Sequence, residues 1–246
     1  MRSTWKYVAT VGLLVAIVAP AHAAPALVEP SLHLDPSPTS PRVALTLDAC
    51  DGATDQRILS ALIENGIPAT IFVTAKWVKR NAASLATMRT HPDLFEIEDH
   101  GGRHVPAIDR PGTVYGLRNA GSPENVATEV ESGAAAYAAA GGQEEKWFRG
   151  ATAKYSPSAI RLIRHLGFKI AGYSVNGDGG SLLSARETER RVTSAKDGDV
   201  IIAHINQPTH AAGEGLVKGL LALRSKGFSF VRLRDVSASG SDGTTD

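Results

Sequence analysis

The sequence has almost no cysteine. Cys50 is the only one among 246 residues, so an internal disulfide is excluded. A domain without disulfides depends on its apolar core or on a bound metal. Hydrophobic residues make up 43% of the sequence, which is enough for a packed core.

The sequence also lacks a block of like charge. Its 26 Lys and Arg residues nearly balance its 25 Asp and Glu residues, giving a formal net charge of +1. Proteins that bind nucleic acid usually carry a concentrated basic patch. We therefore expect no nucleic-acid partner.

Long apolar runs are missing, with one exception near the N-terminus. Arg2 and Lys6 precede an apolar run from Tyr7 to about Ala19, and Ala21-His22-Ala23 follows it. This pattern predicts a signal peptide over residues 1–23, cleaved near Ala23. A retained anchor is the alternative, but a spanning helix needs about 20 apolar residues. We expect a secreted or periplasmic protein with no membrane contact after cleavage.

Two polar segments flank the rest of the chain. Residues 24–41 are rich in Pro and Ser and predict an extended leader without a core of its own. Residues 237–246 are mostly Ser, Gly, Thr and Asp, which predicts a disordered tail. Residues 42–236 contain no second linker and no repeat, and we expect them to form a single catalytic domain.

Short apolar runs alternate with helical patterns through this domain. Strands are predicted at residues 43–47, 69–73, 95–97, 147–149, 169–175, 200–203 and 229–233. Helices are predicted at residues 55–65, 81–90, 125–140, 156–166, 185–195 and 215–226. This alternation predicts an α/β fold with parallel strands. A distorted (β/α) barrel of about seven strands is the first expectation, and a doubly wound open sheet is the second.

Titratable residues follow several of these strands. In both folds the carboxyl ends of the strands meet at one face, where functional residues gather. The residues placed there are Asp48, Asp51, His100, His104, Arg149, Asp178 and His204. Such regular placement favours a catalytic site over scattered surface charge.

His100 and His104 have the spacing of a metal-binding pair. On one helical turn their Cβ atoms would lie about 5–6 Å apart, which suits two imidazoles on one metal. By itself this pattern is more often structural, and Gly101-Gly102 disfavours a regular helix. A carboxylate from another strand end would complete a catalytic metal site.

Asp48 and Asp51 repel each other in one tight loop unless a cation intervenes. One of them is then a metal ligand and the other a general base. Asp51 has an alternative use in an Asx-turn with Gly52, which leaves Asp48 as its rival for the metal. His204 is a general acid if it faces Asp178, and otherwise a core residue.

Five motifs in order carry a family resemblance. Residues 46–52 resemble Thr-Phe-Asp-Asp-Gly, and residues 95–100 with His104 resemble a motif with two histidines four apart. Phe148-Arg149 resembles the start of Arg-Pro-Pro-Tyr, and residues 174–178 and 201–204 resemble the last two motifs. The chain therefore resembles the polysaccharide deacetylases of the NodB-homology type, carbohydrate esterase family 4.

The resemblance implies roles for individual residues. Asp48 is the expected general base and His204 the general acid, oriented by Arg149 and Asp178 respectively. The implied metal ligands are Asp51, His100 and His104, and the implied cofactor is a divalent metal, most simply Zn²⁺. A backbone N–H near Ala151 or Thr152 is expected to bind the oxyanion.

The function that this resemblance implies is removal of N-acetyl groups from an envelope or extracellular polysaccharide, with release of acetate. An O-acetyl esterase of the xylan type and a degenerate carbohydrate-binding relative are the alternatives. Three departures from the family stand out. Ala49-Cys50 separates the two aspartates, Gly150-Ala151-Thr152 replaces Pro-Pro-Tyr, and residues 109–122 form an added loop.

Overall fold

The computed structural model describes Met1 and residues 25–37 and 40–240. Beyond Met1, the predicted signal peptide lies outside the described residues. None of the helices in the described part of the chain is long and apolar enough to cross a membrane.

A parallel sheet forms the centre of the domain. Its eight strands are β2 (Arg42–Ala49), β3 (Ala69–Val73), β4 (Phe95–Asp99), β7 (Trp147–Phe148), β8 (Lys169–Ile170), β9 (Val175–Asn176), β10 (Val200–His204) and β11 (Ser229–Val231). Seven lie in the order β8-β7-β4-β3-β2-β10-β9, and β11 pairs with the first residues of β2. The predicted α/β fold with about seven parallel strands is confirmed.

A short connection between the two edge strands shows that the sheet is curled. β8 and β9 lie at opposite edges, yet only residues 171–174 separate them. Such a connection spans at most about 17 Å, at roughly 3.3–3.6 Å per residue. The single strand predicted over residues 169–175 is therefore two short strands that leave one edge and join the other. This closure produces a distorted barrel and excludes the open, doubly wound alternative.

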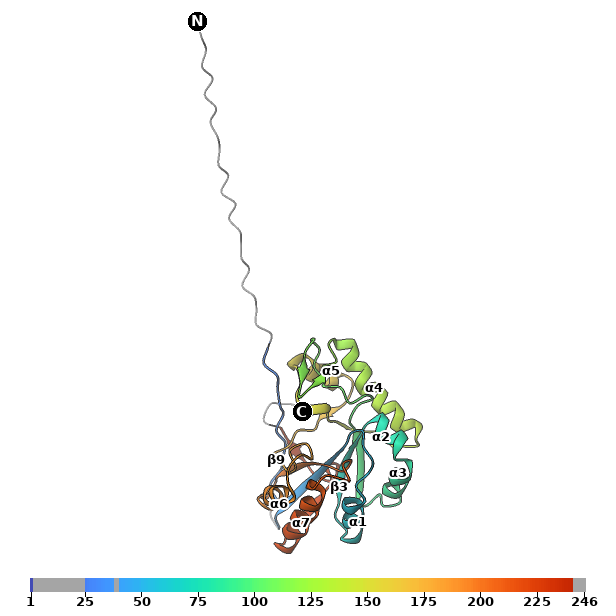
Figure 1. Cartoon of the computed structure of the whole chain (residues 1–246), viewed down its shortest axis with the longest axis vertical. Coiled ribbons are helices and arrows are strands. Elements are labelled where there is room, and N and C mark those ends of the chain that lie inside the picture. Colours follow the sequence, from blue (N-terminus) through green and yellow to red (C-terminus); the bar gives the residue numbers. More distant parts are fainter. Residues whose placement is uncertain (2–24, 38–39, 241–246) are drawn as a thin grey trace.

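Seven helices surround the sheet in the described part of the chain. They are α1 (Gln56–Glu64), α2 (Ala75–Arg80), α3 (Ala82–Arg89), α4 (Pro123–Ala139), α5 (Pro157–His165), α6 (Ala185–Thr193) and α7 (Ala212–Ser225). Helices α6, α7 and α1 are neighbours on one side, and α3, α2, α4 and α5 follow one another on the other (Figure 1). The sequence patterns missed α2, which spans under two turns and is capped by Thr74.

The alternation of side chains along β2 separates the core from the site. Val43, Leu45 and Leu47 pack in the main hydrophobic cluster with the helices. Ala44 belongs to a different cluster, and Thr46 and Asp48 both contact Arg149. Since side chains alternate with a period of two, Asp48 faces the inside of the barrel.

The flanking segments contribute more to the domain than their composition suggested. Leu32 and Leu34 are buried, and β1 (His33–Leu34) pairs antiparallel with β12 (Ala238–Ser239). The structured domain therefore extends beyond the predicted boundaries at 42 and 236. Leu32, Leu34 and Ala238 pack against Ala44 and Val200 of the sheet. The average composition of the two polar segments gave no sign of these few apolar residues. Residues 241–246 lie outside the described part.

Candidate functional site

Asp48 and Arg149 form a buried ion pair at the carboxyl ends of the strands. Arg149 Nη1 donates to Asp48 Oδ1 at 2.9 Å and to Thr46 Oγ1 at 2.9 Å. Its other nitrogens donate to the carbonyl oxygens of Ala171 and Gly172. The guanidinium also lies 4.3 Å from the centre of the Phe72 ring. All three guanidinium nitrogens of Arg149 donate hydrogen bonds. The side chain therefore holds one oxygen of Asp48 in a fixed place.

The charge state of Asp48 follows from its neighbours. Burial raises the pKa of this carboxyl, but the positive charges of Arg149 and the nearby histidines outweigh burial, so its pKa is lowered. Asp48 is therefore an ionised base at neutral pH. Its second oxygen, Oδ2, lies 3.8 Å from His100 Nε2 and remains available.

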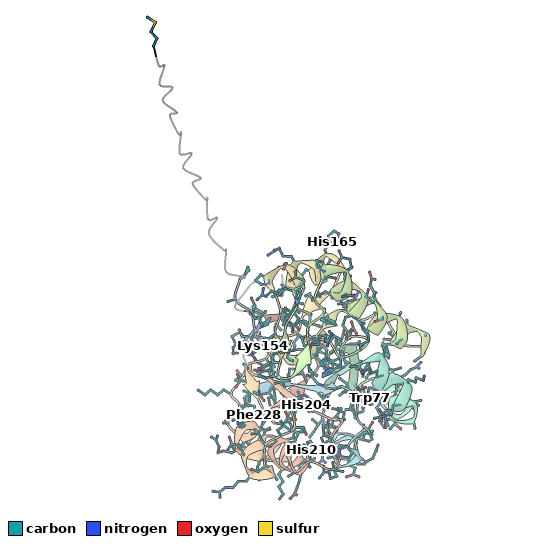
Figure 2. All side chains as sticks on the ribbon, turned by 45° about the horizontal axis from the view of Figure 1, so that its top comes forward. Trp77, Lys154, His165, His204, His210 and Phe228 are labelled. Atoms are coloured by element: carbon teal, nitrogen blue, oxygen red, sulfur yellow. The ribbon has the colours of Figure 1, made fainter. Side chains whose placement is uncertain are left out.

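His204, which is partly buried, forms a second pair with the buried Asp178. His204, labelled in Figure 2, is the last residue of β10. Its ring Nδ1 lies 3.0 Å from Asp178 Oδ1. The backbone N–H of His204 donates to the other carboxylate oxygen at 2.7 Å. Burial lowers the pKa of His204, but Asp178 raises it by more, so the pKa lies well above its ordinary value. His204 is therefore charged and directs Nε2 away from Asp178, as a proton donor requires.

His100 and His104 lie together at the end of β4. Their ring centres are 5.0 Å apart. His100 Nδ1 contacts the carbonyl oxygen of Arg149, which makes Nδ1 the donor and leaves Nε2 for another partner. Burial lowers the pKa of His100, but Asp48 and Cys50 raise it by more. Negative groups thus face Nε2, where a cation would sit.

The loop that joins the two histidines is not the predicted helical turn. His104 has φ of 62° and Gly101 has φ of 87°. A Cβ on Gly101 would lie 2.5 Å from Glu129 Oε1, so only glycine fits there. Glu129 is buried on α4 and accepts hydrogen bonds from the N–H groups of Arg103 and Val105. Sequence patterns missed Glu129, because the helical pattern of α4 gives no sign that one polar residue faces inward.

Cys50, rather than Asp51, faces the two histidines. Cys50 is 8% exposed and its Sγ lies 3.5 Å from His100 Nε2. The Asp51 side chain is 55% exposed and pairs with Lys76 Nζ at 3.1 Å. The structure therefore does not bring the predicted ligand Asp51 to the histidines. The residues inserted after Asp48 turn the loop so that the thiol points inward and the carboxylate outward.

The loop after β7 carries the predicted oxyanion donors. Ala151 is buried, and Thr152 has a left-handed φ of 71° in the short helix η1 (Ala151–Ala153). Within the described residues, the N–H of Gly150 donates to Tyr155 and that of Ala153 to Gly150, whereas the N–H groups of Ala151 and Thr152 have no partner. This pattern agrees with a role in binding an oxyanion. A strained residue beside a reacting centre is typical of functional sites.

The added loop folds into a small hairpin near this site. β5 (Thr113–Val114) and β6 (Leu117–Arg118) pair through a tight turn at Tyr115 and Gly116. Tyr115 is 75% exposed, and Lys154 Nζ lies 5.0 Å from the centre of its ring. Lys154, labelled in Figure 2, directly follows η1. Its contact with Tyr115 places this exposed aromatic ring next to the residue that follows the loop of Ala151 and Thr152.

The donor set fits a divalent metal. One ligand atom each from Cys50, His100 and His104 lie within 4.8 Å of one another, and the described residues contain no second such group. Thiolate and imidazole are preferred ligands of Zn²⁺. With three protein ligands, a fourth position stays open, as in catalytic rather than structural zinc sites.

A comparison with known protein families gives a match over much of the chain. Residues 35–171, more than half of the chain, match the polysaccharide deacetylase family. A curated relative from Pseudobutyrivibrio xylanivorans, a bifunctional xylanase/deacetylase, is 24% identical over 195 residues. That match covers 79% of this chain but 30% of the relative, so the chain spans less than a third of the relative's length.

Solved structures share the fold. An acetyl xylan esterase of family 4 from Clostridium thermocellum, solved with a cobalt ion, has a TM-score of 0.63 and 23% identity, covering 78% of this chain and 88% of its own. A family 4 pseudoenzyme from Bacillus anthracis has a TM-score of 0.63 and 19% identity, covering 81% and 66%. At these identities the likeness establishes the fold alone.

Proposed function

The chain belongs to the polysaccharide deacetylase family, and from this premise we propose that it is a metal-dependent hydrolase that removes N-acetyl groups from a polysaccharide. The observation that supports this most directly is the convergence of two pairs, Asp48 with Arg149 and His204 with Asp178, on one cluster of thiol and imidazole groups. A base, an acid and a set of metal ligands in one place are the parts that amide hydrolysis needs.

Each residue has a defined task in this proposal. Asp48 takes the proton of the attacking water, and Arg149 keeps the carboxylate ionised and oriented. The N–H groups of Ala151 and Thr152 donate to the developing oxyanion. His204, charged through Asp178, gives its proton to the leaving amine. A divalent metal at His100 and His104 would polarise the acetyl carbonyl and favour ionisation of water.

The family and one exposed aromatic side chain support the substrate class that we propose. Family members that share this fold act on acetylated carbohydrates, according to the names of a xylanase/deacetylase and an acetyl xylan esterase. The exposed ring of Tyr115 offers a flat surface on which a sugar ring can stack. We propose an N-acetylated envelope or extracellular glycan of the N-acetylglucosamine type, reached by export of the protein.

The test is acetate release by the wild type and by Asp48→Asn. The variant keeps the hydrogen bond from Arg149 but loses the basic carboxylate, so we expect kcat to fall at least about 100-fold, the lower end for general base catalysis. Metal content, measured by elemental analysis, should stay the same. Full activity in this variant would remove Asp48 from the mechanism.

Two other functions are outcomes of the same assay. Faster release of acetate from O-acetyl xylan than from N-acetyl oligosaccharides would favour an esterase, as the names of both carbohydrate-active relatives suggest. A wild-type protein that binds glycan but releases no acetate would favour a degenerate relative, as in the Bacillus anthracis pseudoenzyme. Assays with added zinc and with chelator should accompany each substrate.

A further inference from the structure

We propose that Cys50 is the third protein ligand of the metal, so that the site is a Cys-His-His centre rather than an Asp-His-His centre. The inference rests on the metal-binding part of the proposed function and is independent of the reaction. It gives the sole thiol of the chain, which is buried, a role in the site.

The geometry of the cluster matches a metal site. In a tetrahedral zinc centre, bonds of about 2.3 Å to sulfur and about 2.0–2.1 Å to nitrogen place the two ligand atoms about 3.5 Å apart. Cys50 Sγ and His100 Nε2 lie 3.5 Å apart. This pair therefore has the spacing of two ligands on one zinc ion, and the ligand atom of His104 lies within 4.8 Å of both.

His100 and His104 are prepared as ligands by different contacts. The carbonyl of Arg149 accepts from His100 Nδ1, which directs the Nε2 lone pair toward Cys50. His104 is held by the backbone of its loop, which Glu129 clamps from α4 through Arg103 and Val105. The ligand atoms of Cys50, His100 and His104 lie within 4.8 Å of one another, which favours an ion bound between them.

The loop around Cys50 is fixed on both sides. Thr74 Oγ1 donates to the carbonyl of Cys50, and Asn81 Nδ2 donates to the carbonyl of Gly52 at 3.1 Å. A Cβ on Gly52 would lie 1.9 Å from the carbonyl oxygen of Asn206, so this turn is packed against the segment that follows β10. Arg80 and Lys76 hold Asp51 from outside. Bringing Asp51 to the histidines would break these contacts.

Asp48 is not an equal rival for the metal. One of its oxygens is already bound by Arg149, and the pair neutralises its charge within the barrel. Among the described residues, the Cys50 thiol has the imidazoles of His100, His104 and His204 as neighbours instead of a guanidinium. A divalent ion bound by His100 and His104 would add its charge beside the thiolate, and Asp48 remains free to act as a base.

A sulfur ligand changes which ions the site accepts. Thiolates are soft donors that favour Zn²⁺, and they bind Mg²⁺, Ca²⁺ and Mn²⁺ poorly compared with carboxylates. Binding also requires loss of the thiol proton, so metal uptake should release a proton. We expect this chain to discriminate against hard cations more strongly than a Cys50→Asp variant does.

The experiment is cobalt substitution of the full chain, followed by absorption spectroscopy. Wild type and Asp51→Asn should bind one Co²⁺ and show an intense sulfur-to-cobalt charge-transfer band in the near ultraviolet. Cys50→Asp should bind cobalt without this band. Cys50→Ser should lose the band and bind zinc more than about 100-fold more weakly, since even outer-shell partners change affinity 10–100-fold.

Several outcomes overturn the inference. They are a wild-type cobalt complex without the band, loss of metal in Asp51→Asn but not in Cys50→Ser, and a wild type that binds no metal. Circular dichroism checks that Cys50→Ser folds, and Cys50→Asp offers a second route if it does not. A wild type with the band but without acetate release would uphold the inference and defeat the proposed function. An active enzyme without the band would do the opposite.

Discussion

The site has two halves that differ in how their polar groups are satisfied. In the acid-base half, Asp48 is held by Arg149 and His204 by Asp178, so each charge has a protein partner. In the ligand half, ligand atoms of Cys50, His100 and His104 lie within 4.8 Å of one another. We propose that a metal ion completes this half, because thiolate and imidazole are preferred ligands of Zn²⁺. The acid-base half is complete as the chain folds.

The largest expected effect on stability concerns the acid-base half. Arg149→Met should reduce the free energy of unfolding by about 3–5 kcal/mol, because it leaves the buried carboxylate of Asp48 without its partner. Urea unfolding followed by circular dichroism measures this. The control is Arg190→Met, which removes an exposed ion pair to Glu187 and should cost at most about 1 kcal/mol. An equal loss of unfolding free energy in both variants would show that the buried Asp48–Arg149 pair contributes no more to stability than an exposed pair.

The ligand half should respond to metal instead. Zinc at a free concentration of 100 times its Kd should stabilise the protein by about 2.7 kcal/mol, because it binds the folded state alone. Thermal unfolding with zinc and with chelator measures this shift. His204→Gln should keep the stabilisation and Cys50→Ser should lose most of it. Loss of the zinc-induced stabilisation in His204→Gln would show that His204 also contributes to metal binding, and that the two halves are not independent.

A third region contains a buried carboxyl group, that of Glu145, which keeps its proton at neutral pH. Glu145 is buried, its Oε1 has no partner among the described residues, and burial raises its pKa to about 8. The folded state therefore holds a proton that the unfolded chain loses at its ordinary pKa of about 4.5. Its contribution to stability is present below about pH 4.5 and is lost as the pH rises through about 8.

Glu145→Gln should flatten this dependence on pH. The slope that it removes is at most about 1.4 kcal/mol per pH unit, the value for one proton. Urea unfolding of wild type and variant across this pH range gives the difference directly. Glu144→Gln, at the exposed neighbouring position, is the control and should leave the slope unchanged. An unchanged slope in both variants would mean that Glu145 is ionised in the folded protein.

Sequence alone predicted the parts of the site that depend on strand ends. Asp48 and His204 follow apolar runs that are visible in the sequence, and the structure pairs them with Arg149 and Asp178 respectively. Arg149 and Asp178 also lie where the motifs placed them.

The contacts made by loops were beyond the reach of sequence patterns. Which of Cys50 and Asp51 points inward depends on Thr74, Asn81 and the backbone of Asn206, which come from three other parts of the chain. The helical explanation for His100 and His104 was wrong for the same reason. Their loop takes its shape from Glu129, 25 residues beyond His104 in the sequence. Periodicity predicts which face of an element is buried, but it carries no information on such distant contacts.

The pairing of β1 with β12 has a practical consequence for engineering. Leu34 lies opposite Ala238, so strands near the two ends of the described domain lie side by side. A short linker could join these strands, and new termini could be opened at the exposed Tyr115-Gly116 turn. Such a circular permutant would keep every site strand intact. The same adjacency suits the domain for insertion into a surface loop of a carrier protein, with both junctions at one point.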